Sequence, residues 1–226
     1  MIDIEKNHHT LQARIRSSLA LANRGDSELT VVAVSKKKSL ADIGKAYRLG
    51  LINFGENYLQ EAIPKIENFE HDVVWHFIGS IQSNKAKAIA KYFDWVHTLT
   101  RDKIANRLNE SRPKKMPPLN ICIQVKLEEN DTRSSLEIDQ LHDFALKINE
   151  LPNLKLRGLM GMTSFKASEE QRNQSYQKMR NEFEALIRKG IEMDTLSMGM
   201  SDDLEIAIQN HSNMIRIGTA LFGSRE

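Results

Sequence analysis

The sequence predicts an α/β fold, a single (β/α)8 barrel of the TIM type with an additional N-terminal helix. Three observations lead to this prediction: short apolar runs alternate with helix-period segments, eight such pairs follow one another, and 226 residues suffice for one barrel. Nearly continuous apolar runs are typical of parallel strands that are covered on both faces. An open doubly wound sheet would give the same pattern, because periodicity does not reveal whether a sheet closes.

The additional helix is predicted over residues 3–23, where apolar residues recur at helical spacing and Gly25 follows as an expected stop. Its apolar positions are Leu11, Ile15 and Leu19. We expect residues 1–25 to pack on the barrel and residues 1–226 to form one domain, since no composition shift marks a linker or a second domain.

The strands are predicted from the apolar runs, and the helices between them from capping residues. The expected strands are Val31–Val34, Leu51–Phe54, Val73–Gly79, Asp94–Leu99, Leu119–Val125, Leu154–Met162, Asp194–Met200 and Asn213–Gly218. The expected helix signals are the capping boxes Ser39/Asp42 and Ser168/Gln171, the N-caps Thr100 and Ser201, and the terminating glycines Gly50 and Gly190. Pro64 is expected to kink or end the third helix of the chain.

Composition and charge exclude several classes of function. The net charge of +2, from 32 basic and 30 acidic residues, gives no overall footprint for nucleic acid. The N-terminus has no apolar signal region and no stretch is long enough to span a bilayer, so we expect a cytoplasmic protein without a membrane partner. The one cysteine, Cys122, lies in an apolar run and is expected to be a buried apolar residue rather than a reactive thiol.

In a barrel of this type the functional residues lie at the carboxyl ends of the strands. The polar or flexible residues at these expected ends are Lys36, Asn57, His76 with Gln82, Thr98, Lys126, Met162, Ser201, Arg216, Gly218 and Thr219. They converge on one mouth only if the barrel prediction holds.

The first strand leads into three lysines in the stretch "TVVAVSKKKSL". Partial shielding and the neighbouring cations Lys37 and Lys38 would disfavour the ammonium form of Lys36 and make its amine a nucleophile that can form a Schiff base. The alternative, a solvated basic turn, explains the same spacing.

The loops after the last two strands have features of a phosphate site. Gly199 and Gly218 allow a close approach of the backbone, while Ser201 and Thr219 offer hydroxyl groups at expected helix N-termini. Asp202 and Asp203 would repel a dianion if they faced it. A lysine combined with a phosphate site indicates a phosphorylated aldehyde as ligand, and a class I aldolase fits that outline too.

Six ordered motifs then identify a family resemblance. "AVSKKKS", "NFGENYLQE", "WHFIGSIQSNK", "LRGLMGM", "LSMGMSDDLEIAI" and "MIRIGTALFG", which span about residues 31 to 223, closely resemble the pyridoxal-phosphate homeostasis protein family. That family resembles the N-terminal barrel domain of alanine racemase, the fold-type III arrangement. The resemblance implies pyridoxal 5′-phosphate (PLP) as cofactor and no established catalytic reaction.

The resemblance also assigns roles to individual residues. It implies a Schiff base of PLP with Lys36, Asn57 beside the ring, the phosphate on Ser201, Gly218 and Thr219, and Arg216 facing the pyridine nitrogen. Because arginine stays protonated, it would keep that nitrogen unprotonated and the ring a poorer electron sink. Alternatively, Arg216 caps a strand end or pairs with a carboxylate.

We therefore expect a non-catalytic PLP-binding protein that acts in intracellular PLP (vitamin B6) homeostasis. The resemblance implies that an alanine-racemase-like enzyme would need a second base from a further domain, and we expect no such domain here. A PLP-dependent amino-acid racemase or Schiff-base lyase remains the alternative, and an interaction protein that docks through its basic turn is a third reading. The expected partners are PLP and PLP-dependent apoenzymes, with no nucleic acid and no membrane, and the expected oligomeric state is a monomer.

Other residues are expected to be structural. His76 and His97 lack a carboxylate or cysteine at metal-ligand spacing and are expected to be packed or hydrogen-bonded in the core, with no metal. Met160, Met162, Met198 and Met200, on the sixth and seventh expected strands, are expected to contribute to the packing of the barrel rather than to a special function. The sequence departs from the family pattern at Ser80, where proline is usual, and in the loop at 126–135.

Overall fold

The computed structural model describes residues 3–129 and 132–223 of the chain. Within these residues, parallel strands β1 to β8 pair in chain order, and β8 pairs with β1 to close the barrel. The strands are β1 Thr30–Val34, β2 Asn53–Glu56, β3 Val74–Phe77, β4 Trp95–Leu99, β5 Leu119–Gln124, β6 Leu154–Met160, β7 Thr195–Ser197 and β8 Met214–Ile217. The barrel prediction is confirmed and the open sheet is excluded.

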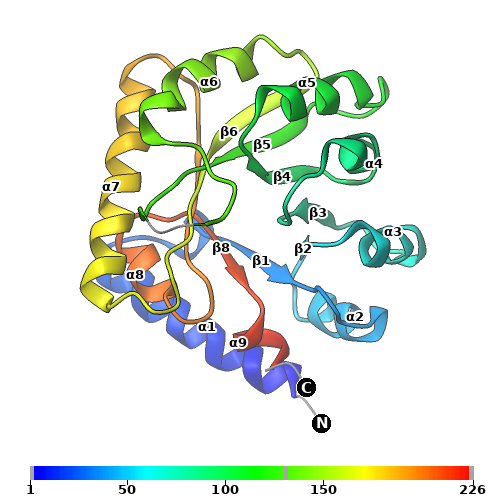
Figure 1. The fold of residues 1–226 in the computed structure, drawn as a ribbon. Coiled ribbons are helices and arrows are strands. Elements are labelled where there is room, and N and C mark those ends of the chain that lie inside the picture. The colour runs from blue at the N-terminus through cyan, green and yellow to red at the C-terminus, as the bar shows by residue number, and fades with distance from the viewer. Residues whose placement is uncertain (1–2, 130–131, 224–226) are drawn as a thin grey trace.

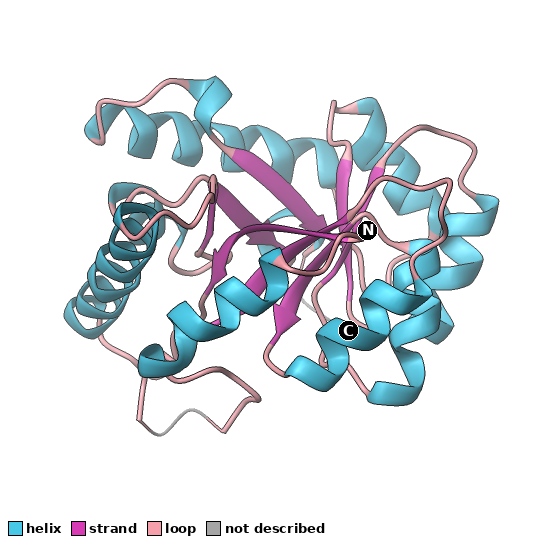
Figure 2. Ribbon diagram, turned by 90° about the horizontal axis from the view of Figure 1, so that it is seen from above, coloured by secondary structure: helices cyan, strands magenta, loops and turns pink. Residues whose placement is uncertain are grey.

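Helices surround the strands, as Figures 1 and 2 show from two directions. They are α1 Ile4–Leu21, α2 Leu40–Arg48, α3 Leu59–Asn68, α4 Ala86–Tyr92, α5 Asp102–Ser111, α6 Leu141–Asn149, α7 Glu169–Arg188, α8 Leu204–Gln209 and α9 Thr219–Phe222. The additional helix α1 packs against α8 and α9. An ion pair of 2.6 Å between Arg14 and Glu205 and a hydrogen bond of 3.0 Å from Asn7 Nδ2 to the Leu221 carbonyl hold it there.

The predicted capping boxes begin two of these helices. Ser39 Oγ accepts a hydrogen bond of 3.2 Å from the Asp42 amide at the start of α2, and Ser168 Oγ accepts one of 3.2 Å from the Gln171 amide at the start of α7. Gly50 and Gly190 follow α2 and α7 with φ of +89° and +88°, the left-handed conformation that glycine adopts without steric cost.

Two predicted helix ends are wrong by a few residues. Helix α1 ends at Leu21, and Asn23 rather than Gly25 supplies the left-handed residue, with φ of +54°. The N-cap of α5 is Arg101, while the predicted Thr100 places its hydroxyl 3.1 Å from Ser134 Oγ.

The second strand and the third helix also differ from the prediction. Strand β2 starts two residues later than expected, because the amide of Leu51 still bonds to the Ala46 carbonyl at 3.2 Å and closes the turn after α2. Helix α3 continues through Pro64 to Asn68, whose side-chain amide donates to the Pro64 carbonyl at 2.7 Å. Proline therefore does not end α3.

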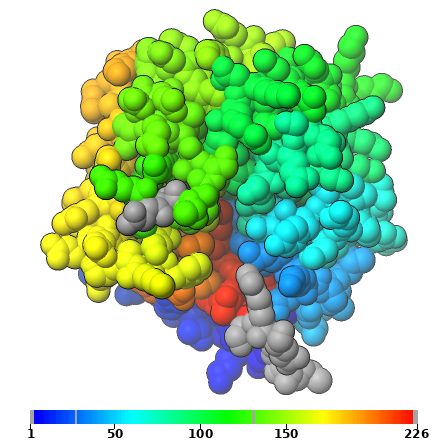
Figure 3. Space-filling model, viewed as in Figure 1, coloured from blue at the N-terminus to red at the C-terminus, as the bar shows by residue number. Residues whose placement is uncertain are grey.

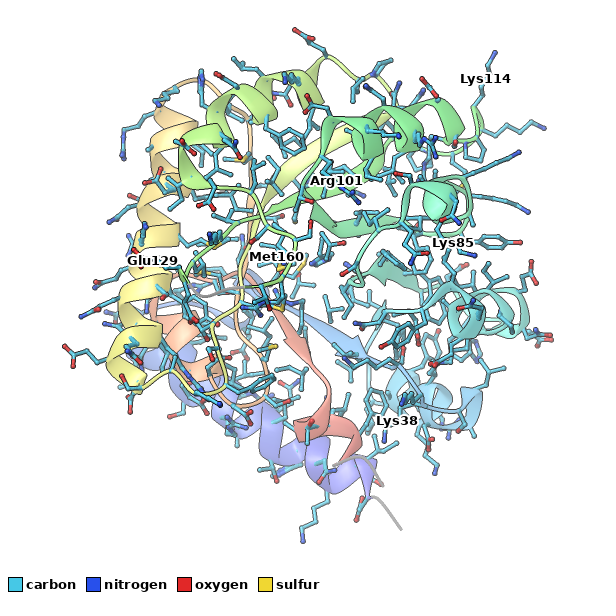
Figure 4. All side chains as sticks on the ribbon, in the orientation of Figure 1. Lys38, Lys85, Arg101, Lys114, Glu129 and Met160 are labelled. Carbon is cyan, nitrogen blue, oxygen red and sulfur yellow. The ribbon has the colours of Figure 1, made fainter. Side chains whose placement is uncertain are left out.

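Apolar side chains form two clusters, one between strands and helices and one inside the barrel. The inner cluster contains Val32, Trp95, Cys122, Met160 and Met214. Burial raises the pKa of the Cys122 thiol to about 12, which confirms the expectation of an unreactive cysteine. Met160, labelled in Figure 4, lies at the centre of the barrel and confirms the packing role expected for it.

Among the described residues, no helix combines the length and the apolar character that crossing a membrane requires.

Candidate functional site

The six residues predicted to form the site lie at the carboxyl ends of β7, β8, β1 and β2, which are consecutive around the barrel. They are Lys36 after β1, Asn57 after β2, Ser201 after β7, Arg216 in β8, and Gly218 and Thr219 directly after β8. Figure 3 shows a recess near the centre of one face, where orange and red residues from the last part of the chain lie deeper than their neighbours.

The three consecutive lysines have different surroundings. Lys36 is half-buried, whereas Lys37 is exposed and has a φ of +60°. The Lys37 amide donates to Glu61 Oε2 at 2.8 Å, which fixes this turn. Lys38, labelled beside α2 in Figure 4, donates from Nζ to the Phe222 carbonyl at 2.9 Å. A uniformly solvated basic turn is therefore wrong for this stretch, because Lys36 and Lys38 are both half-buried.

A buried ion-pair cluster of Ser35, Glu56 and Lys65 lies directly behind Lys36. Lys65 Nζ donates to Glu56 Oε1 and to the Ser35 carbonyl, both at 2.8 Å, and Ser35 Oγ donates to Glu56 Oε1 at 2.7 Å. Burial raises the pKa of the Glu56 carboxyl, against the opposing effect of its hydrogen bonds to Lys65 and Ser35. Because Lys65 binds the carbonyl of the residue before Lys36, the cluster fixes the backbone from which the Lys36 side chain extends.

Sequence reasoning missed this cluster. The second strand was expected to end at Phe54, which placed Glu56 in the turn that follows, although Glu56 is the last residue of β2 and has no exposed surface. The available signal was Lys65, nine residues later in the helix that follows the same strand.

Asn57 has a buried polar atom for which the described residues supply no hydrogen-bond partner. Its Oδ1 is buried and accepts no hydrogen bond from the described residues. The next loop fits tightly against the Asn57 backbone, since a Cβ at Gly79 would lie 2.1 Å from the Asn57 carbonyl oxygen. A cavity of about 420 Å³ opens beside them, lined also by Tyr58, Phe77 and Lys85. A buried acceptor next to a cavity can bind a donor on a ligand.

The β7 and β8 loops form one unit, although not as predicted. Ser201 Oγ accepts a hydrogen bond of 3.0 Å from the Ala220 amide at the start of α9, so it joins the two loops instead of capping α8. The residue directly before α8 is Asp203. Gly199 is required by its own turn, because its φ is +92° and a Cβ there would lie 2.5 Å from Ala207 Cβ.

The two aspartates do not form a pair facing the site. Asp203 is buried and accepts hydrogen bonds from Tyr176 Oη at 2.7 Å, Thr163 Oγ1 at 3.0 Å and the Met200 amide at 2.6 Å. Asp202 is exposed. These three hydrogen bonds stabilise the Asp203 carboxylate and the loop that carries it.

Gly218 and Thr219 lie at the end of β8, next to β1. A Cβ at Gly218 would make only ordinary contacts, the nearest at 3.6 Å from Val34 Cβ, and its φ is −109°. Neither packing nor backbone conformation therefore requires glycine at this position. Thr219 is exposed and half-buried Gly218 precedes it, so both can contact a ligand in the recess.

Arg216 extends its guanidinium within the barrel, where it is 4% exposed. NH1 donates to the Ser197 carbonyl at 2.9 Å and to Ser197 Oγ at 2.6 Å, and NH2 donates to the Gly161 carbonyl at 3.0 Å. Burial lowers the pKa of the guanidinium from its usual value. These partners are neutral oxygens, so the alternative in which Arg216 pairs directly with a carboxylate is not supported by its hydrogen bonds.

Behind Arg216, hydrogen-bonded side chains cross the barrel. We call Asn53, His76, His97, Ser197 and Arg216 the histidine relay. His97 Nδ1 lies 3.2 Å from Ser197 Oγ, His97 Nε2 lies 2.9 Å from His76 Nδ1, and His76 Nε2 lies 3.0 Å from Asn53 Oδ1. Burial lowers the pKa of His76 to about 3 and that of His97 well below its usual value. The expectation of hydrogen-bonded core histidines is confirmed.

The remaining strand-end residues have other partners. Thr98 Oγ1 donates to the Gly79 carbonyl at 2.6 Å, and Lys126 pairs with Glu137 at 2.7 Å. In residues 3–129 and 132–223, no group of His, Cys, Asp and Glu side chains is arranged to hold a metal ion. Part of the 126–135 loop, residues 130 and 131, lies outside the described residues.

Comparison with known proteins gives a consistent result. Residues 7–226 match the family model described as alanine racemase, N-terminal domain. The pyridoxal phosphate homeostasis protein of Pasteurella multocida is 43% identical, over 99% of this chain and 98% of its own length. The protein of the same name from Pseudomonas aeruginosa is 44% identical, over 100% of this chain and 97% of its own length.

A solved structure extends the likeness to three dimensions. PipY of Synechococcus elongatus, in a solved structure with PLP bound, is 30% identical and superimposes with a TM-score of 0.82. The match covers 93% of this chain and 99% of PipY.

Proposed function

The chain belongs to the alanine racemase N-terminal domain family and, within it, to the pyridoxal phosphate homeostasis proteins, and from this premise we propose that it binds PLP and acts in PLP homeostasis. The observation that carries the proposal is the convergence of a half-buried lysine, a buried arginine and two neighbouring loops on four adjacent strand ends. The PLP bound to PipY supports it, because that protein shares the fold and 30% of the sequence.

The residues present fit this cofactor. Asn57 Oδ1, which is buried without a hydrogen-bond partner among the described residues, and the glycine at position 218, which packing does not require, would both be explained by a ligand that contacts them. Ser201, Gly218 and Thr219 would hold the phosphate, and the Lys36 amine would join the cofactor aldehyde as a Schiff base with release of one water. Arg216 would lie at the pyridine nitrogen.

When bound, PLP supplies an electron-withdrawing ring for reactions of amino acids. A cationic Arg216 disfavours protonation of the ring nitrogen, and its NH1 and NH2 groups are held by Ser197 and Gly161. We therefore propose a carrier rather than an enzyme. We further propose that the chain forms one domain, works as a cytoplasmic monomer and supplies PLP-dependent apoenzymes.

The test is the absorbance spectrum of the purified protein after incubation with PLP. We expect a yellow protein that borohydride bleaches, with the reduced label on Lys36 in peptide mapping. Lys36→Ala should be colourless, while Lys37→Ala serves as the matched control and should remain yellow, because Lys37 is exposed. A wild-type protein that stays colourless and unlabelled would refute the proposal.

Further assays separate the alternatives. Turnover of D- or L-amino acids well above the rate with free PLP would replace the carrier with a racemase or lyase. Pull-down of an apoenzyme that is unaffected by Lys36→Ala would show that docking does not require the bound cofactor, as an interaction protein predicts.

A further inference from the structure

We propose that Ser197, His97 and His76 form a one-way hydrogen-bond relay that positions Arg216 for the cofactor in this site. The inference rests on the proposed function, since the cofactor gives the relay its purpose. It adds residues from β3, β4 and β7 that have no exposed surface.

The two ends of the relay fix its direction. Asn53 Oδ1 is an acceptor only, so His76 Nε2 must carry a hydrogen and donate across the 3.0 Å contact. A guanidinium is a donor only, so Ser197 Oγ must accept from Arg216 NH1 at 2.6 Å. The hydroxyl hydrogen of Ser197 is therefore directed toward its other neighbour, His97 Nδ1.

Between these two ends, neutral imidazoles give the remaining hydrogen bonds the same direction. A neutral His76 that donates through Nε2 has a bare Nδ1, which accepts from His97 Nε2 at 2.9 Å. A neutral His97 that donates through Nε2 has a bare Nδ1, which accepts from Ser197 at 3.2 Å. Every hydrogen bond of the histidine relay therefore has one possible direction, and both histidines are in the Nε2–H tautomer.

Packing enforces neutrality and orientation. Both imidazoles are fully buried, and the ring of Trp95 stacks on His76 with centroids 5.4 Å apart and planes 17° from parallel. An extra proton on His76 Nδ1 would face the hydrogen on His97 Nε2 across 2.9 Å and add a second buried charge near Arg216. The lowered pKa values of both histidines agree with this geometry.

The orientation of the Ser197 hydroxyl determines how Arg216 is held. If His97 Nδ1 carried a hydrogen, Ser197 Oγ would accept hydrogen bonds from both Arg216 and His97. The hydroxyl hydrogen of Ser197 would then have to point away from the relay. With Nδ1 bare, the Ser197 hydrogen is held away from the guanidinium and a lone pair faces it. Ser197 and His97 are therefore positioning residues for Arg216.

The first experiment needs no cofactor. Long-range ¹H–¹⁵N correlation spectra of the cofactor-free protein at neutral pH should show His76 and His97 neutral and in the Nε2–H form. Ser197→Ala should leave both histidines in the Nε2–H form, because Asn53 still fixes the relay from its other end, but it should shift the ¹⁵N resonance of His97 Nδ1, because that nitrogen loses its donor. A charged imidazole, or an Nδ1–H tautomer at either position in the wild-type protein, would overturn the relay.

The second experiment measures PLP affinity and the absorbance maximum of the bound cofactor. Ser197→Ala and His97→Leu should each weaken binding about tenfold and shift the maximum, as expected for losing support of a charged group. His97→Gln should restore affinity to within about threefold, because its amide offers an acceptor and a donor. Unchanged affinity and spectrum in both disrupting variants would refute the positioning role.

Folding and cofactor failures are distinguishable. Urea unfolding of each variant identifies one that is merely unfolded, and Ser197→Ala, the smallest change, carries the test if His97→Leu does not fold. Failure of the wild-type protein to bind PLP would refute the proposed function and the positioning role, while the spectra of the cofactor-free protein would still decide whether the relay exists.

Discussion

The two halves of the site are supported by buried polar groups of opposite character. Behind Lys36, the ion-pair cluster buries a carboxylate and an ammonium 2.8 Å apart. Behind Arg216, the histidine relay buries two neutral imidazoles whose hydrogen bonds have one permitted direction. Opposite charges hold the groups behind Lys36 in place, whereas the groups behind Arg216 are held by hydrogen bonds between neutral histidine tautomers. The stability of the two halves should therefore respond differently to mutation and to pH.

The largest effect is expected when the ion pair loses one partner. Glu56→Ala leaves the Lys65 ammonium, which is 9% exposed as a residue, without its counter-ion and should cost about 3–5 kcal/mol of unfolding free energy. Urea unfolding at neutral pH measures this loss. The double variant Glu56→Leu/Lys65→Met should recover most of it, because it leaves no unpaired charge. If the single and double variants lose the same unfolding free energy, the loss comes from packing and not from the unpaired charge.

The histidine half should instead be sensitive to acid. The folded pKa of His76 is lowered to about 3 from 6.5, so the unfolded chain binds more protons between these values. Stability from this group is complete above pH 6.5 and is lost as the pH falls toward 3, by about 2 kcal/mol at pH 5. Urea unfolding at pH 7 and pH 5 should show a smaller loss for His76→Gln than for the wild type. Identical pH slopes would contradict the neutral relay.

Alanine substitutions at two glycines, one on each side of the site, test whether packing or ligand binding requires the glycine. On the lysine side, Gly79→Ala places a Cβ 2.1 Å from the Asn57 carbonyl oxygen and should cost about 1–3 kcal/mol in thermal or urea unfolding. On the phosphate side, Gly218→Ala should change stability by less than about 0.5 kcal/mol but weaken PLP binding about tenfold. Stability loss at Gly218 without a binding defect would assign that glycine to the fold.

The smallest effect on PLP affinity is expected where the two halves of the site meet. Lys38→Met removes the hydrogen bond from the β1–α2 turn to the Phe222 carbonyl and should cost about 0.5–1.5 kcal/mol. PLP affinity should stay within about twofold of the wild type, because Lys36 keeps its own support. A large loss of affinity on titration with PLP would mean that the two halves are coupled through this contact.

The sequence was sufficient to predict the eight strand–helix pairs and the strand ends that carry the candidate residues, because both depend on local periodicity and chain order. The sequence was insufficient to predict the buried side chains that support the site, because these side chains meet only when the barrel closes. His97 and Ser197 are 100 residues apart, and only the closed barrel brings their strands to opposite ends of one hydrogen bond. Glu56 was missed for a related reason, since its burial depends on a partner in the next helix. Ser201 was assigned to the wrong helix because its partner, Ala220, lies on the following strand-to-helix connection.

The pairing of the first strand with the last has a consequence for biosynthesis. Val32 of β1 is in register with Arg216 of β8, so Lys36 and Arg216 come from opposite ends of the polypeptide. Contacts between such distant segments form late and slow the search for the native state. A nascent chain whose last strand is still inside the ribosomal exit tunnel therefore has the lysine but no complete pocket, so the cofactor site forms only after that strand has emerged.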